Sequence, residues 1–169
     1  TVGCAPYRNP ALLAKITSNI DVISGGRLIW GVGAGWYDNE FRGYGYDFLP
    51  AADRIRVLRE TVEIVKALWS EPDVSYQGRH FTLDGAQCDP KPLQQPHPEV
   101  LIGGGGEQLT LRVVARHADA SNFGGKPHAA WPSYIPITFE AMVFWAALGS
   151  ALVAIIAGKK DTIPQPPPM

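Results

Sequence analysis

The sequence predicts an α/β fold in which parallel strands alternate with helices. Two observations carry this prediction: short apolar runs end in glycine-rich loops, and segments with apolar residues at three- and four-residue steps follow those loops. Helices of ten or more residues between strands are typical of parallel pairing through right-handed crossovers. Since glycine loops then follow the carboxyl ends of strands, we expect them to share one face, where such folds bind ligands.

Composition excludes several classes of function. The 169 residues include 15 Lys and Arg and 16 Asp and Glu, and the basic residues form no run. A near-neutral chain lacks the field that attracts nucleic acid, so we expect no nucleic-acid partner. Cys4 and Cys88 lack CxxC spacing, and no two histidines have metal-ligand spacing, so we expect reduced thiols and no metal site. The chain begins at Thr1 without a charged leader, as a piece of a longer protein would.

The first elements follow a short apolar start at Val2. Asn9 can cap a helix whose first turn accommodates Pro10, and the apolar spacing predicts this helix over 10–23. Its inward face is expected to carry Leu12, Leu13, Ile16, Ile20 and Ile23. Gly25-Gly26 supplies a left-handed exit, and the run from Arg27 to Gly33 predicts a buried strand.

A glycine-rich loop, 31–40, follows this strand. Ala34-Gly35-Trp36 breaks the G-x-G-x-x-G spacing, so a dinucleotide-binding fold is not favoured. The next helix is predicted over 53–69, with an inward stripe of Ile55, Leu58, Val62, Val65 and Trp69. The charged residues expected on its solvated face are Arg54, Arg56, Arg59, Glu60, Glu63 and Lys66. A hairpin around Gln77-Gly78 and a proline-rich segment, 90–98, come next.

The four consecutive glycines Gly103 to Gly106 separate an apolar strand from a helix predicted over 107–117. Without side chains, the backbone N–H groups can close on an anion, which the helix dipole also favours. We expect this anion to be phosphate. A tight strand-to-helix turn is the alternative role of these glycines. One more short strand is predicted over 119–123.

These motifs together resemble the luciferase-like monooxygenase family of flavin- and F420-dependent oxidoreductases. The resemblance rests on Asn9-Pro10, Ile23 to Leu28, Gly31-x-Gly33-x-Gly35-Trp36, the helix from Arg54 to Trp69, Ile102 to Glu107 and Arg116 to Asp119. It covers about residues 1–123 and implies an incomplete (β/α)8 TIM-type barrel, with about four strands near Val2, Leu28, Val100 and Ala120. Open edges of such a barrel favour low solubility or a homodimer.

The resemblance also implies a cofactor site. Gly103, Gly104, Gly105 and Gly106 would hold the cofactor phosphate, Gly33, Gly35 and Trp36 would border the ring system, and Asn39 would offer an amide. The implied cofactor is coenzyme F420, with FMN as the alternative, and the implied partner is a small-molecule substrate. The cofactor performs the redox chemistry, so no side chain is assigned as a catalytic acid or base. For Trp36, Tyr37 and Glu40, loop packing and helix capping remain alternative roles.

From Gly124 onward the charge density falls. We expect a linker over 124–134, a transmembrane helix over 135–160 and a disordered, proline-rich tail over 161–169. Residues 141–158 are 18 residues without a charge and would span about 27 Å as a helix, near the thickness of a bilayer core. This predicts membrane contact through 141–158 beside a cytoplasmic barrel part, with a buried helix of a soluble core as the alternative.

Residues 125–158 resemble the small membrane subunit of the quinol-oxidising alternative complex III. Two unrelated partial regions would then meet near Gly124. Three interpretations of the chain therefore stay open. It is a fragment of an oxidoreductase, with or without activity of its own, a membrane-anchored structural subunit of a respiratory complex, or a non-functional chimeric reading frame.

Overall fold

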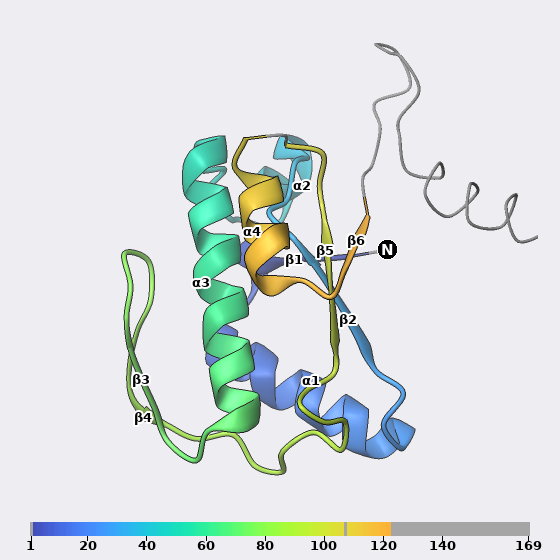
Figure 1. Cartoon of the computed structure of the whole chain (residues 1–169). Coiled ribbons are helices and arrows are strands. Elements are labelled where there is room, and N and C mark those ends of the chain that lie inside the picture. The colour runs from blue at the N-terminus through green and yellow to red at the C-terminus, as the bar shows by residue number, and fades with distance from the viewer. Residues whose placement is uncertain (1, 107, 123–169) are drawn as a thin grey trace, which may run out of the picture. The chain divides into compact units, whose positions relative to one another are not determined.

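A parallel sheet forms the centre of the computed structural model, which describes residues 2–106 and 108–122 (Figure 1). Its strands are β1 (Gly3–Cys4), β2 (Ile29–Gly33), β5 (Glu99–Gly103) and β6 (Ala120–Asn122), in the spatial order β1-β2-β5-β6. Each strand is parallel to its neighbour. The structure thus confirms the α/β fold and the four strands expected from the sequence.

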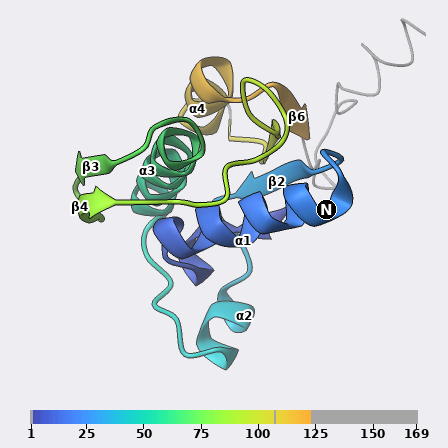
Figure 2. The same cartoon turned by 90° about the horizontal axis from the view of Figure 1, so that it is seen from below.

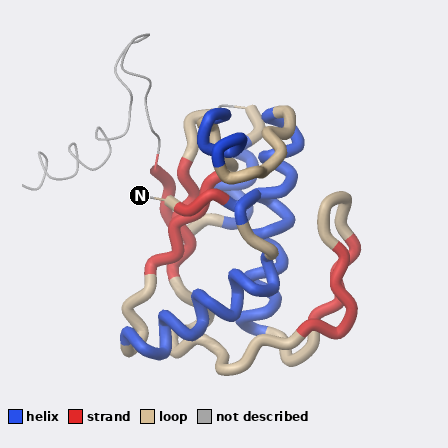
Figure 3. The backbone as a smooth tube through the Cα atoms, turned by 180° about the vertical axis from the view of Figure 1, so that it is seen from behind, coloured by secondary structure: helices blue, strands red, loops and turns tan. Residues whose placement is uncertain are grey.

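Helices cover one face of this sheet (Figures 1 and 3). They are α1 (Pro10–Ser24), α3 (Ala51–Ser70) and α4 (Thr110–His117), whereas the short helix α2 (Asp38–Gly43) lies in the loop after β2 and a 3-10 turn, η1 (Ala5–Tyr7), follows β1. The expected hairpin is present as β3 (Val74–Gln77) and β4 (Thr82–Ala86), which pair antiparallel beside α3 (Figure 2).

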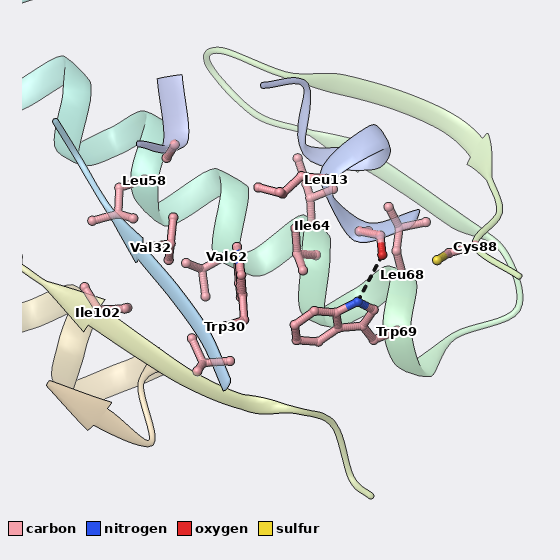
Figure 4. Close-up of a cluster of buried hydrophobic side chains, with 14 of the residues drawn as sticks. Leu13, Trp30, Val32, Leu58, Val62, Ile64, Leu68, Trp69, Cys88 and Ile102 are labelled. Atoms are coloured by element: carbon pink, nitrogen blue, oxygen red, sulfur yellow. Dashed lines mark hydrogen bonds between the residues drawn. The ribbon is translucent and has the colours of Figure 1, made fainter. Parts of the chain in front are cut away.

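The core lies between the sheet and these helices (Figure 4). Trp30, Val32, Val100 and Ile102 point to the helix side, where they pack with Leu58, Val62 and Val65. Each buried aliphatic side chain stabilises the fold by roughly 1.5–3 kcal/mol relative to an exposed one. Trp69 packs edge-on against Trp30, with 5.3 Å between ring centroids, and its indole N–H donates to the Ala14 carbonyl over 3.3 Å.

The alternate residues of the strands point to the opposite face of the sheet. Among the described residues no helix covers that face, and Ile29 there is 58% exposed. This face of the sheet is therefore open within the described part of the chain.

The predicted helix α1 is confirmed, with the Asn9 side chain accepting from the N–H of Ala11 and Leu12 and with Gly25 left-handed at φ 69°. Of its predicted inward face only Leu13 is buried, and the prediction is wrong for Leu12, Ile16, Ile20 and Ile23, which are between 38% and 86% exposed. The buried face is instead made of Pro10, Leu13, Ala14, Thr17, Ser18 and Asp21. Small and hydroxyl side chains let α1 lie close to α3, and their polar groups find backbone partners: the Thr17 hydroxyl donates to the Leu13 carbonyl over 2.7 Å.

The predicted helix α3 is also confirmed, but the assignment of Glu60 to its solvated face is wrong. Glu60 is 0% exposed, and its carboxylate accepts from the N–H groups of Arg79, His80 and Phe81 at 3.0, 2.9 and 3.1 Å. A buried carboxylate is tolerated when hydrogen-bond donors surround it. Glu60 therefore anchors the β3–β4 hairpin to α3.

The helix expected from residue 107 begins at Thr110. No helix among the described residues has both the length and the apolar composition needed to cross a membrane. The predicted linker, transmembrane helix and tail, 124–134, 135–160 and 161–169, lie outside the described residues.

Candidate functional site

The carboxyl ends of the four strands form a continuous row. Cys4 pairs with Gly33, Gly33 with Gly103, and Gly103 with Asn122. The loops that follow β2 and β5 therefore leave the sheet at the same edge, as Figure 1 shows. This confirms that both glycine-rich loops share one face of the fold.

Two glycines of the row are required by close packing. A Cβ on Gly103 would lie 2.9 Å from Cγ2 of Val2, and a Cβ on Gly33 would lie 3.1 Å from the Gly103 carbonyl oxygen. The Val2 side chain thus occupies the space beside both residues on the face opposite the helices. Gly33 and Gly103 shape the rim of the site through this packing, which is a structural reason for glycine at both positions.

Fewer backbone amides of the four glycines are available to bind a ligand than the sequence suggests. Gly103 belongs to β5, and the Gly104 N–H donates to the Asn122 carbonyl over 2.9 Å, with Gly104 at φ 144°. Among the described residues, the N–H groups of Gly105 and Gly106 have no hydrogen-bond partner, and both residues are exposed. These two amides, just before α4, are the ones available to an anion.

The loop after β2 is held in an unusual backbone conformation. Gly35 has φ 76°, and a Cβ there would lie 2.6 Å from the Cys4 sulfur and 2.7 Å from the Phe41 ring. Only glycine fits this conformation and this space. The next residue, Trp36, is 82% exposed, and its ring lies 5.3 Å from that of Tyr37. The exposed indole is free to stack on a flat ligand.

Asn39 lies in the first turn of α2 and is exposed. Its side-chain amide reaches the Tyr37 hydroxyl at 3.4 Å, a long contact that a ligand can replace. The sequence placed this residue in a loop, whereas a helix orients it. Gly35, Trp36 and Asn39 thus come from one short segment, 35–39, after β2.

Arg54 supports this segment and was missed by the sequence analysis, which assigned it to a solvated face. Its Nε donates to the Gly35 carbonyl over 3.2 Å, its Nη1 donates to the Leu49 carbonyl, and its guanidinium carbon lies 3.9 Å from the centre of the Phe48 ring. Arginine suits this role because its planar group both stacks and donates in fixed directions. The only sequence signal is its position at the start of the helix that follows the loop.

The polar groups near the edge keep their protons at neutral pH. Burial and then the Glu40 charge raise the pKa of Cys4 to about 11. Burial and the hydrogen bond to Glu40 raise the pKa of Tyr7 to about 12, and the Tyr7 hydroxyl donates to the Glu40 carboxylate over 3.1 Å. Cys4 is therefore a neutral thiol rather than a nucleophilic thiolate.

The candidate metal ligands stay apart. Within residues 2–106 and 108–122, no three His, Cys, Asp or Glu side chains gather as a metal site would need. Cys4 and Cys88 are free thiols. His80 and His117 lie near the carboxylates of Asp53 and Glu63, at 3.8 and 3.5 Å.

Comparison with known proteins gives consistent matches. The family model described as luciferase-like monooxygenase matches residues 1–138. The chain is 38% identical over 96 residues to an FMNH2-dependent dimethylsulfone monooxygenase of Pseudomonas putida, covering 57% of this chain and 26% of that protein. It is 31% identical over 116 residues to an F420-dependent glucose-6-phosphate dehydrogenase of Amycolatopsis mediterranei, covering 69% of this chain and 33% of the relative.

Among solved structures, an F420-dependent secondary alcohol dehydrogenase in complex with an F420-acetone adduct aligns with a TM-score of 0.64 and 26% identity. The alignment covers 72% of this chain and 36% of that structure. The chain thus spans about a quarter to a third of the length of the two curated relatives it matches.

Proposed function

This chain belongs to the luciferase-like monooxygenase family, and from that membership we propose that it binds the phosphate and ring of a deazaflavin or flavin coenzyme as part of an oxidoreductase. The observation that carries the proposal is the pair of available amides at Gly105 and Gly106, on the same sheet edge as the Trp36 segment. Two adjacent backbone N–H groups without a described partner suit an anion, because both can donate to the same negatively charged group.

Each element of the site has a defined part in this proposal. The amides of Gly105 and Gly106 donate to the phosphate, and Gly104 fixes the turn through its bond to Asn122. The exposed indole of Trp36 stacks on the ring system, and Asn39 donates to a polar atom of the ring. Arg54 holds the backbone that carries Trp36. When bound, the coenzyme supplies the hydride or oxygen-linked chemistry, and the chain positions it.

We propose coenzyme F420 as the ligand, with FMN as the alternative. The two relatives named above divide between these coenzymes, one being FMNH2-dependent and one F420-dependent. The resemblance of Gly35-Trp36 and of the four-glycine exit to F420 users favours F420. A small-molecule substrate and full turnover belong to a closed barrel of eight strands, of which the described residues supply four.

Fluorescence titration of the full chain tests the proposal. The chain is titrated with F420 and with the same deazaflavin lacking phosphate, and in parallel with FMN and riboflavin. Hydrogen bonds to a charged group contribute about 1.5–3 kcal/mol, so the phosphorylated form is expected to bind at least about tenfold more tightly. Equal affinities for the two forms, or saturable binding of none of the four compounds, would refute the proposal.

A matched variant separates the two halves of the site. Trp36→Leu removes the stacking surface but leaves the amides of Gly105 and Gly106 in place. We expect both the phosphorylated and the phosphate-free compound to bind more weakly, by a similar factor, so that their affinity ratio is preserved. A change in the ratio would show that Trp36 contacts the phosphate rather than the ring.

Residues 141–158 support a second candidate function, membrane contact by a structural subunit, because they carry no charge over 18 residues. The resemblance of 125–158 to a subunit of the quinol-oxidising alternative complex III supports the same candidate. Carbonate extraction of membranes from cells that express the full chain is the test. Retention in the membrane pellet is expected for a spanning helix, and release into the supernatant would refute this candidate.

A further inference from the structure

A groove of about 240 Å³ lies between α3 and α4, on the helix side of the sheet. Ile55 of α3 and Val113 of α4 form an apolar floor, and Leu109, 45% exposed, closes one end. The proposed coenzyme site does not use this groove. Its lining residues come from the first half of α3, from α4 and from Leu109, which precedes α4.

Both walls of the groove carry arginines. Arg56 and Arg59 project from α3, and Arg112 and Arg116 from α4, while no Asp or Glu of the described part of the chain lines the groove. The spacings of three and four residues place each pair on one helix face. Four guanidinium groups thus converge on one short recess in a chain whose formal net charge is −1.

The two walls differ in how their charge is neutralised. Arg56 pairs with Asp53 at 2.7 Å and Arg59 with Glu63 at 3.6 Å, both on α3 itself. Arg112 and Arg116 are exposed and have no carboxylate within 4.0 Å among the described residues. The α4 wall therefore supplies positive charge that the described part of the fold does not balance.

His117 also lines the groove, and the charges of Arg116 and Arg59 act on the pKa of its imidazole. Burial lowers its pKa, Glu63 raises it, and Lys66, Arg116 and Arg59 lower it, so that the net pKa is below the usual value. The imidazole Nε2 lies 3.5 Å from Glu63, and the Lys66 ammonium donates to the His117 carbonyl over 3.3 Å. An anion bound between the arginines would favour the charged imidazolium and raise this pKa.

We propose that the α3–α4 groove binds a small molecule with two or more phosphate or carboxylate groups. Guanidinium groups on facing walls can each form paired hydrogen bonds with such groups. The size of the ligand follows from the groove, because α4 has eight residues and so spans only about 12 Å. The apolar floor accommodates the carbon skeleton or a short linker between the charged groups.

The test is an NMR pH titration of the His117 imidazole in the full chain, with pyrophosphate and with citrate as probes. Sodium chloride at the same ionic strength is the control, because screening alone also acts on surface charges. We expect a saturable rise in the His117 pKa with at least one probe and none with chloride. Pyrophosphate alone would identify a phosphate ligand, and citrate alone a polycarboxylate ligand.

Variants identify the groove as the origin of the effect. The double variant Arg112→Gln and Arg116→Gln is expected to weaken binding of the probe at least about tenfold, because it removes the two guanidinium groups that no described carboxylate neutralises. Arg27→Gln removes one exposed charge at the α1–β2 turn and should leave the affinity unchanged. Both changed side chains of α4 are exposed, so the fold is expected to survive.

Three results would overturn the inference: the same shift in chloride, equal weakening by Arg27→Gln and by the double variant, or no shift at His117 with either probe. A probe that shifts only the amide signals of Gly105 and Gly106 would place the anion at the glycine loop. That outcome would remove the groove but leave the proposed function intact, so the two failures are distinguishable.

Discussion

At the scale of single residues, three charged side chains form hydrogen bonds with the backbone of loops: Asp21, Arg54 and Glu60. Asp21 accepts from the N–H groups of Leu28, Leu93 and Gln94 and from the Gln94 side chain. Glu60 accepts from the 79–81 backbone, and Arg54 donates to carbonyls of the 35–49 segment. Hydrogen bonds that involve a charged group contribute more to stability than those between neutral groups.

Asp21 makes the stability of the fold depend on pH. Burial raises the pKa of Asp21, but hydrogen bonds from Gln94, Leu93 and Leu28 together lower it by more than burial raises it. The net pKa is therefore below the usual value. A carboxyl with a lowered folded-state pKa stabilises the fold above its unfolded pKa of about 4, and this contribution is lost as the pH falls through the folded pKa.

We expect Asp21→Asn to lower the free energy of unfolding by about 2 kcal/mol at pH 7, since the amide turns a donor toward other donors. The difference from the unaltered chain should shrink as the pH falls below about 4, because the carboxyl of the unfolded chain becomes protonated there while that of the folded chain does so only at lower pH. Urea unfolding at pH 7, 5 and 3 measures it. Asp84→Asn, at an exposed position of β4, is the control and should have little effect at any pH. A difference that grows at low pH would contradict this account.

Arg54 is predicted to act as a positioning residue. Arg54→Gln removes the bonds to Gly35 and Leu49, so hydrogen exchange of the 35–49 backbone should rise and coenzyme affinity should fall by roughly tenfold, the effect of about 1.4 kcal/mol. Arg54→Lys keeps one donor group and should rescue part of the affinity. Arg56→Gln, which loses only a surface ion pair with Asp53, should retain full affinity. Faster exchange without any loss of affinity would mean that the loop does not position the coenzyme.

At the scale of the elements, the most apolar side of α1 faces away from the hydrophobic core. Ala14, Thr17 and Ser18 face α3 and the proline-rich loop, and the Ser18 hydroxyl donates to the Pro90 carbonyl. Close contact and hydrogen bonds determine the orientation here. The apolar stripe of Leu12, Ile16, Ile20 and Ile23 is left at the surface of the described unit.

This orientation predicts opposite effects for two similar substitutions. Leu13→Ala should cost about 2–5 kcal/mol, because Leu13 is 9% exposed within the core. Ile23→Ala should change the free energy of unfolding by no more than about 0.5 kcal/mol, because Ile23 is 86% exposed. Chemical denaturation compares the two. A large loss from Ile23→Ala would show that the stripe is covered in the full chain.

For this chain, the sequence predicts where helices and strands occur better than it predicts which side of a helix is buried. Asn9, Gly25 and the glycines that end β2 and β5 act locally, so α1, α3, α4, the strands and the shared edge followed from the sequence, whereas the short helix α2 was expected to be a loop. The buried sides of α1 and the burial of Glu60 depend on partners far along the chain, Pro90 and the 79–81 backbone, which periodicity does not register. The same limit applies to Gly104, whose amide is taken by Asn122 across the sheet. The proposed cofactor site was therefore outlined by the sequence, and the structure shows which of its backbone amides lack a partner among the described residues.

At the scale of the whole molecule, the described residues that build the core and those of the proposed binding site lie on different parts of the sheet. Helices cover one face of the sheet and build the core, whereas the carboxyl edge carries the exposed Trp36 and the amides of Gly105 and Gly106. Four parallel strands with this arrangement fit the luciferase-like monooxygenase family, in which a closed barrel would have eight. Further strands of such a barrel would pair with the edge strands β1 and β6, and the face without helices would line the barrel interior.

The central claim is that Gly105 and Gly106 donate their amides to a coenzyme phosphate. It is tested most directly by proton–nitrogen NMR spectra of the full chain, recorded while F420 or FMN is added. We expect the amide protons of Gly105 and Gly106 to move downfield with saturation, while that of Gly104, already bonded to Asn122, moves little. Saturable binding that leaves the Gly105 and Gly106 signals in place would contradict the account.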